Sequence, residues 1–135
     1  MTAGYSGTPL PAKLGMKPGT TVAWVNAPDG FRVLLEPLPD GVRVKTRAAG
    51  SLDVLVVFVT RRADLVRRLP ALRRAIAPAC AGWIAWPKRS SGVATDITED
   101  VVREVALPTG LVDVKVCAID ETWSGLKLVI RKELR

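Results

Sequence analysis

The length, composition and charge of the chain describe one globular domain with an excess of positive charge. Its 135 residues are 48% hydrophobic and 24% charged, which excludes an intrinsically disordered chain and a coiled coil. Lys and Arg outnumber Asp and Glu by 20 to 13, and the net charge of +7 favours anionic partners. No segment is long and apolar enough to span a membrane, so we expect a single cytoplasmic domain over residues 1–135.

The chain contains no histidine, and its two cysteines, Cys80 and Cys117, lie far apart in the sequence. The absence of histidine excludes Ser-His-Asp and Cys-His catalysis. Neither cysteine belongs to a metal-binding spacing, so we expect two free, buried thiols and no metal site.

The first third of the chain predicts short elements separated by turns. Residues 1–12 are rich in turn formers and are expected to form an extended arm, with a short helix over residues 11–16. Residues 21–26 predict the first strand. Residues 31–36 predict a short helix that ends before Pro37, and the alternation over residues 42–46 predicts an edge strand.

The middle of the chain predicts the centre of the sheet. Residues 53–60 form a nearly continuous run of β-branched and aromatic residues, as in a parallel strand covered on both faces. Residues 62–77 predict a helix by the spacing of their leucines, and Pro70 predicts a kink or a break in it. Residues 77–82 predict a turn, and residues 83–86 another buried strand.

The last third predicts one helix and a hairpin. The helix covers residues 98–107, with Asp96 or Thr98 as its cap, and Asp96 with Glu99 fits a capping box. Residues 111–119 and 123–132 are alternating strands joined by a short link. Their apolar positions are expected to form one face, with Cys117 on the opposite face: Val112, Val114, Val116, Leu126, Leu128 and Ile130.

This order of elements predicts a doubly wound, Rossmann-like α/β fold with helices on both faces of the sheet. We expect a mostly parallel six-stranded sheet in the order 2-1-3-4-6-5. The last strand is expected to run antiparallel, beside strand four.

Several segments resemble the class I methyltransferases. They are residues 14–19 followed by 22–25, and residues 53–60 followed by the helix, the turn and the strand over 83–86. The resemblance implies a Rossmann-like fold and S-adenosylmethionine as the cofactor.

The sequence departs from these enzymes where they hold the cofactor. Residues 26–30 read NAPDG in place of a glycine-rich turn, and Pro28 removes one amide donor. No acidic residue follows the strand over 42–46 to bind ribose. The sequence therefore implies no particular cofactor, whose identity stays unknown at this point, and S-adenosylmethionine is not favoured.

A second resemblance covers nearly the full length. The chain looks like the bacterial domain of unknown function 3052 in its segments YSGTPL (residues 5–10), VNAP (25–28), AWPK (85–88), GVATD (92–96) and ETWSGLK (121–127). This family's activity is not established, so the resemblance implies a compact cytoplasmic fold and no substrate.

The carboxyl ends of the parallel strands are the expected place for a ligand. The loop over residues 87–97 is long for a connection between a strand and a helix, and long loops are often functional. The candidate ligand-binding residues on this rim are Asn26, Asp29, Thr60, Arg61, Trp86, Lys88, Ser90, Ser91, Gly92, Asp96 and Trp123.

Each candidate has two interpretations at this point. Lys88, Ser90, Ser91 and Gly92 form either an anion cradle or an ordinary polar loop. Asp96 is either a helix cap, which we favour, or a general base. Trp86 and Trp123 either stack on a ligand or pack in the core.

Three functions follow from these observations. We favour a non-catalytic binding or regulatory module with an anion- or nucleotide-type crevice. The alternative is a divergent S-adenosylmethionine-dependent methyltransferase-like enzyme. A third possibility is nucleic-acid binding through the arginine-rich helix at residues 61–74, whose arginines otherwise form a solvated face. The expected partners are an anionic small molecule or a protein, and no membrane.

Overall fold

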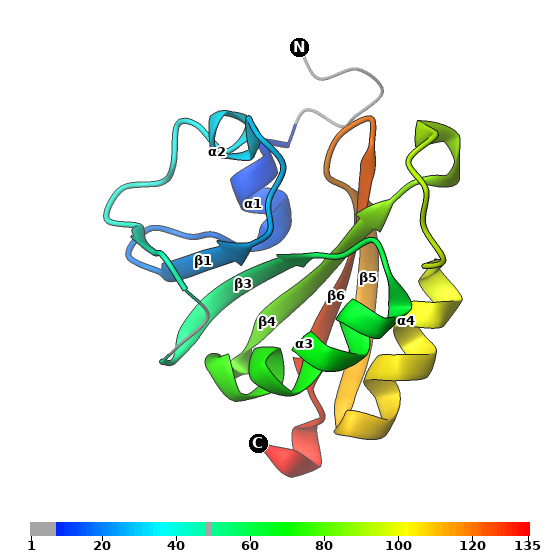
Figure 1. Cartoon of the computed structure of the whole chain (residues 1–135). Helices are drawn as coiled ribbons and strands as arrows, with labels where there is room; N and C mark the ends of the chain where they lie inside the picture. Colours follow the sequence, from blue (N-terminus) through cyan, green and yellow to red (C-terminus); the bar gives the residue numbers. More distant parts are fainter. Residues whose placement is uncertain (1–7, 48–49) are drawn as a thin grey trace.

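A computed structural model describes residues 8–47 and 50–135, and in this part of the chain six strands form one sheet (Figure 1). The strands are β1 (Thr21–Val25), β2 (Arg43–Lys45), β3 (Leu52–Phe58), β4 (Ile76–Pro87), β5 (Leu111–Ala118) and β6 (Trp123–Ile130). Their order is β2-β1-β3-β4-β6-β5. The first four are parallel, and β6 runs antiparallel to both neighbours. The predicted Rossmann-like topology and strand order are confirmed.

Helices cover both faces of the sheet. They are α1 (Leu10–Leu14), α2 (Phe31–Leu34), α3 (Arg62–Ala75) and α4 (Glu99–Ala106), with single turns η1 (Arg89–Ser91), η2 (Leu107–Thr109) and η3 (Lys132–Leu134). One core forms where α3 and α4 pack on the sheet, and a second core forms under α1 and α2. Trp83 ties the second core together, because its Nε1 donates to the carbonyl of Leu14 at 3.0 Å.

The burial of the central strand β3 explains why its sequence is apolar at every position except Asp53. Val54, Val56 and Phe58 face the core under α1 and α2, whereas Leu55 and Val57 face the core under α3 and α4. Both faces are therefore buried, as a strand between two helical layers requires.

Helix α3 runs without a break through Pro70, where a kink or a break was expected. Pro70 lies on the exposed side, and it removes only the one hydrogen bond that its missing N–H would make. Leu65, Leu69 and Leu72 are fully buried on the opposite side, and their packing holds the helix through this position.

Strand β4 is longer than predicted, and it includes the expected turn at residues 77–82. Ile76 pairs with Leu52 and Ala81 with Val54, so β4 advances five residues while β3 advances two. The turn signal in the sequence corresponds to this irregularity within the strand.

In the edge strand β5, Val112, Val114 and Val116 do not form the single apolar face that was predicted. Asp113 lies opposite Leu128 and Lys115 opposite Lys127, so Val114 is an extra, unpaired residue at a β-bulge. Side chains beyond the bulge change faces, and Val112 and Val116 no longer share one. The three valines at positions 112, 114 and 116 are 37%, 52% and 41% exposed.

The remaining differences are small. Helix α1 begins at Leu10, inside the predicted arm, and residues 1–7 of that arm lie outside the described residues. In the part of the chain that the structure describes, no helix is long and apolar enough to cross a membrane.

Candidate functional site

The loops that follow β1, β3 and β4 meet at the carboxyl edge of the sheet, because these three strands run parallel. The hairpin between β5 and β6 reaches the same edge, since Trp123 lies opposite Pro87 at the end of β4. The predicted site residues therefore share one rim. Six of them are exposed on it: Asn26, Asp29, Arg61, Ser90, Gly92 and Asp96.

The crevice between β1 and β3 is where the chain turns in opposite directions, and such a point is the usual ligand position in doubly wound sheets. Here Asn26 adopts a left-handed conformation with φ 58°. With its amide oriented toward Arg68, the Asn26 oxygen accepts from Nη2 at 2.9 Å and from Nε at 3.3 Å. Asn26 thus binds α3, which ties the loop after β1 to the helix across the crevice.

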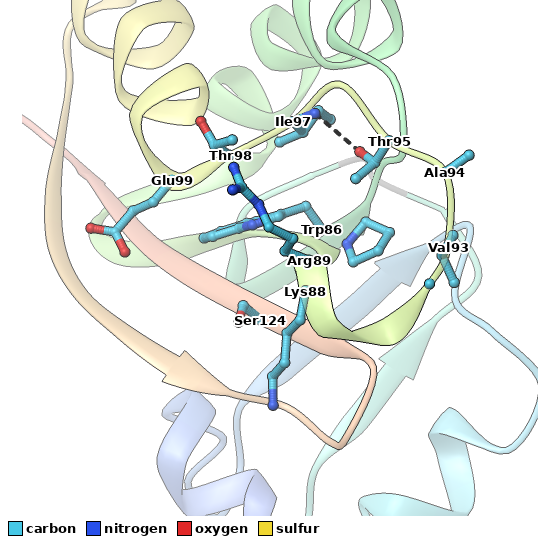
Figure 2. A pocket seen from close by; sticks show the side chains of 12 residues that line it. Trp86, Lys88, Arg89, Val93, Ala94, Thr95, Ile97, Thr98, Glu99 and Ser124 are labelled. Atoms are coloured by element: carbon cyan, nitrogen blue, oxygen red, sulfur yellow. Dashed lines mark hydrogen bonds between the residues drawn. The ribbon is translucent and has the colours of Figure 1, made fainter.

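A pocket opens on the other side of β3 from this crevice, at the end of β4, and we call it the Trp86 pocket (Figure 2). Its volume is about 580 Å³, within the range of small-molecule sites. It is lined by Trp86, Pro87, Lys88, Arg89, Gly92, Val93, Ala94, Thr95, Ile97, Thr98, Glu99 and Ser124. Three of these, Trp86, Lys88 and Gly92, belong to the predicted site.

Trp86 and Ser124 lie directly opposite each other on neighbouring strands, on the face that α4 covers. Trp86 is 6% exposed and provides an apolar wall. Figure 2 shows the side chains of Arg89, Thr98 and Glu99 beside the indole of Trp86. The pocket therefore combines an aromatic surface with hydroxyl groups, a carboxylate and a guanidinium.

The loop over residues 92–98 is held in place by Thr95. Its Oγ1 donates to the carbonyl of Thr60 at 2.6 Å and accepts from the N–H of Ile97 at 3.0 Å. Thr60 therefore supports this loop through its backbone. Gly92, with φ 79°, ends η1 in a conformation that a side chain would strain.

Lys88 and Ser91 have structural contacts within the predicted anion cradle. The Lys88 ammonium donates to the carbonyl of Asp120 at 2.7 Å, and its backbone N–H donates to that of Thr122 at 2.7 Å. Ser91 Oγ donates to the Lys88 carbonyl at 2.7 Å and accepts from Val93 N–H at 3.2 Å. These contacts join β4 to the hairpin and close the turn.

Asp96 caps a helix, but it is the preceding helix, α3. Its Oδ1 accepts from the backbone N–H of Arg62 at 2.7 Å, and the residue at the cap position, Arg61, supplies no side-chain bond. The predicted capping box with Glu99 is wrong, because Asp96 points toward α3. Thr98 caps α4 as predicted, with its Oγ1 accepting from Val101 N–H at 3.2 Å.

The two candidate tryptophans lie on opposite faces of the sheet. Trp123 is half-buried in the core under α1 and α2, where its ring meets Phe58 edge-to-face at 5.1 Å between centroids. Only Trp86 lines the pocket on the other face.

Several pocket residues were not predicted from the sequence. Arg89, Thr98 and Glu99 belong to the long loop and helix that the sequence did single out. Ser124 comes from a distant segment, and its place opposite Trp86 could have been found only from the register of β6 against β4.

Both cysteines are free, as predicted, but they are half-buried where buried thiols were expected. Burial raises the pKa of both thiols, and for Cys80 a contact of 3.5 Å to Asp53 Oδ1 raises the pKa further. Among residues 8–47 and 50–135, no group of His, Cys, Asp and Glu side chains has the arrangement of a metal site.

Comparison with known proteins identifies the fold. No protein family model and no curated protein matches the sequence, so membership of the domain of unknown function 3052 family stays a prediction. The structure is similar to an S-adenosylmethionine-dependent methyltransferase from Aquifex aeolicus, with TM-score 0.64 and 16% identity over 89% of this chain and 87% of that one.

Two further solved structures show the same fold at low identity. A ribosomal protein L11 methylase from Lactobacillus delbrueckii subsp. bulgaricus matches with TM-score 0.58 and 12% identity, over 90% of this chain and 75% of that one. The fibrillarin pre-rRNA processing protein of Methanococcus jannaschii matches with TM-score 0.54 and 14% identity, over 94% and 70%. The fold is thus methyltransferase-like.

Proposed function

We propose that this protein is a divergent S-adenosylmethionine-dependent methyltransferase that holds an adenosyl ligand in the Trp86 pocket. The observation that carries the proposal is the presence of this pocket at the carboxyl edge of a methyltransferase-like sheet. The likeness covers most of both chains in the Aquifex aeolicus comparison, so it is not limited to a few strands.

The residues of the Trp86 pocket suit the chemistry of such a ligand. Trp86 offers an apolar surface for a purine ring, and Glu99, Thr98 and Ser124 offer oxygen atoms for an amino group and for ribose hydroxyls. The Arg89 guanidinium suits a carboxylate. When bound, S-adenosylmethionine supplies an activated methyl group.

The crevice between β1 and β3 does not suit the cofactor. A close approach of backbone to ligand needs residues without Cβ atoms and with free N–H groups. Asn26 instead contacts Arg68, Ala27 carries a Cβ, and Pro28 has no N–H. For this reason we place the ligand in the Trp86 pocket.

The second candidate is a non-catalytic binding module. It is favoured because charged side chains near the pocket already have partners within the protein. Glu99 forms an ion pair with Arg103, and Lys88 holds the hairpin. The chain also has no histidine to act as a general base. Ligand binding without methyl transfer would distinguish this candidate from the enzyme.

Calorimetric titration and thermal unfolding with S-adenosylmethionine and S-adenosylhomocysteine test the proposal. Binding should raise the melting temperature by mass action, since a ligand at 100 times its Kd adds about 2.7 kcal/mol. Arg89→Ala should weaken binding at least about tenfold, as expected for a lost charged contact of about 1.4 kcal/mol. Arg74→Ala is the matched control, because it removes an exposed arginine far from the pocket.

The outcomes separate the candidates. No binding of either compound, or binding that Arg89→Ala leaves unchanged, would exclude the Trp86 pocket as an adenosyl site. If the compounds bind, incubation with methyl-labelled S-adenosylmethionine and a cell extract distinguishes an enzyme, which transfers label to an acceptor, from a binding module, which does not.

A further inference from the structure

We propose that a basic surface at the amino end of the parallel strands binds the phosphodiester backbone of a nucleic acid. This amino-edge patch consists of Arg73, Arg74, Arg131, Lys132 and Arg135, from the last turn of α3 and the segment after β6. Figure 1 shows the C-terminal turn at the end of the sheet opposite the η1 loop. The patch is therefore separate from the Trp86 pocket, and the two proposals can fail independently.

The two segments of the patch meet at Gly110. A Cβ atom built on Gly110 would lie 2.8 Å from Leu134 Cδ1 and 3.2 Å from Arg73 Nη2. Arg131 lies beside the same turn, since its backbone N–H donates to the Gly110 carbonyl at 3.0 Å and its Nη2 to the Leu107 carbonyl at 3.0 Å. The arginines of α3 and of the C-terminal segment are thus neighbours.

The positive charge of the patch is not neutralised internally. No acidic side chain in the described part of the chain forms an ion pair with any of the five residues, and their own segment holds one acidic side chain, Glu133. The earlier turns of α3 differ, because Arg62 pairs with Glu104, and Arg67 and Arg68 both pair with Asp64. The predicted nucleic-acid surface over the whole helix thus narrows to its last turn.

Arg73 is the central member of the patch. Its Nε is buried and has no hydrogen-bond partner, a rare condition for a charged donor. A phosphate group on the patch would supply the missing negative charge beside the guanidinium.

The composition of the patch favours phosphate over other anions. Four of its five residues are arginines, whose planar guanidinium binds phosphate through two parallel hydrogen bonds. The tryptophan and phenylalanine side chains of the described residues belong to the two cores, so none is available here to stack on bases. Binding should therefore depend on the backbone of the nucleic acid and not on its sequence.

Fluorescence anisotropy with a labelled poly-uridine oligonucleotide tests the proposal in NaCl from about 50 to 200 mM. Affinity of the wild type should fall steeply with salt. The patch variant Arg73→Gln/Arg131→Gln/Lys132→Gln should bind at least about tenfold more weakly at low salt, with a log–log salt slope shallower by about 2, as expected for three lost phosphate contacts.

A matched control variant is Arg61→Gln/Lys115→Gln/Lys127→Gln. It removes three charges elsewhere and likewise lowers the net charge from +7 to +4. Its salt slope should equal that of the wild type. If the patch variant does not fold, Arg74→Gln/Lys132→Gln changes only exposed side chains and should flatten the slope by about 1.

Three results would overturn the proposal. The first is a wild type that does not bind the oligonucleotide at low salt. The second is an equal loss of binding in both triple variants, which would mean that only net charge matters. The third is displacement of the oligonucleotide by poly-glutamate as effectively as by unlabelled RNA, which would identify an acidic protein as the partner.

Discussion

Asp96 caps helix α3 from 34 residues away in the sequence: its Oδ1 accepts the backbone N–H of Arg62 at 2.7 Å. The bond links the long loop beside the Trp86 pocket to the start of a core helix. It gives the loop a fixed position and supplies the cap that Arg61 does not provide.

Asp96→Ala should lower the free energy of unfolding by about 1 kcal/mol, because the first turn of α3 loses its cap. Urea denaturation measures the loss. Asp100→Ala is the control, since the Asp100 side chain is 95% exposed and its change should stay within about 0.5 kcal/mol. Unchanged stability together with lost ligand binding would instead assign Asp96 to the ligand.

Gly82→Ala should destabilise the protein by about 1–3 kcal/mol through overpacking. The new Cβ would lie 2.7 Å from Leu72 Cδ2, where α3 packs on β4. Adding Leu72→Val shortens the opposing side chain, so the double variant should lose less than the two single variants together. Strict additivity in denaturation experiments would show that this close approach is not the cause.

Lys88 and Arg89 are adjacent but should respond differently to substitution. Lys88→Met should lower the free energy of unfolding by about 1 kcal/mol, because the ammonium no longer holds the Asp120 carbonyl. Arg89→Ala should leave stability within about 0.5 kcal/mol, since the side chain is exposed. Thermal unfolding without ligand compares them, and equal losses would contradict the assignment of Lys88 to the hairpin.

Asp113 should make stability depend on pH. The Arg103 guanidinium lowers the pKa of the Asp113 carboxyl below its usual range, through a hydrogen bond of 2.8 Å. The stabilisation is therefore present above the pKa of an unfolded aspartate, about 3.9, and is lost as the pH falls through the lower folded pKa. Asp113→Asn should destabilise the protein at about pH 6 and have little effect at about pH 2. A loss of equal size at both pH values in urea unfolding would contradict this.

The sequence was sufficient to predict the order of the sheet, because each strand carried its own pattern. The continuous apolar run of β3 and the hairpin of β5 and β6 fixed the centre and the antiparallel end. The bulge at Val114 could not be predicted, because it depends on pairing with β6 and not on local residues. Helix α3 passed through Pro70 because tertiary packing of its leucines outweighed one lost hydrogen bond.

The sequence singled out the loop that lines the Trp86 pocket but not the contacts within that loop. Loop length identified residues 87–97, and this loop does line the Trp86 pocket. Lys88 and Asp96 were candidates for ligand binding because their actual partners lie far away in the sequence: the Asp120 carbonyl for Lys88 and the Arg62 backbone N–H for Asp96. A single sequence gives no information on such long-range bonds.

The bulge in β5 also affects whether the free edge of the sheet can pair with a further strand. An edge strand with three exposed valines would normally be a template for adding another strand, and so for aggregation. Val114 interrupts the regular spacing of donors and acceptors along that edge, and Lys115 adds a charge beside it. The irregularity at Val114 and the charge of Lys115 therefore make this edge a poorer template for a further strand than its exposed valines alone would suggest.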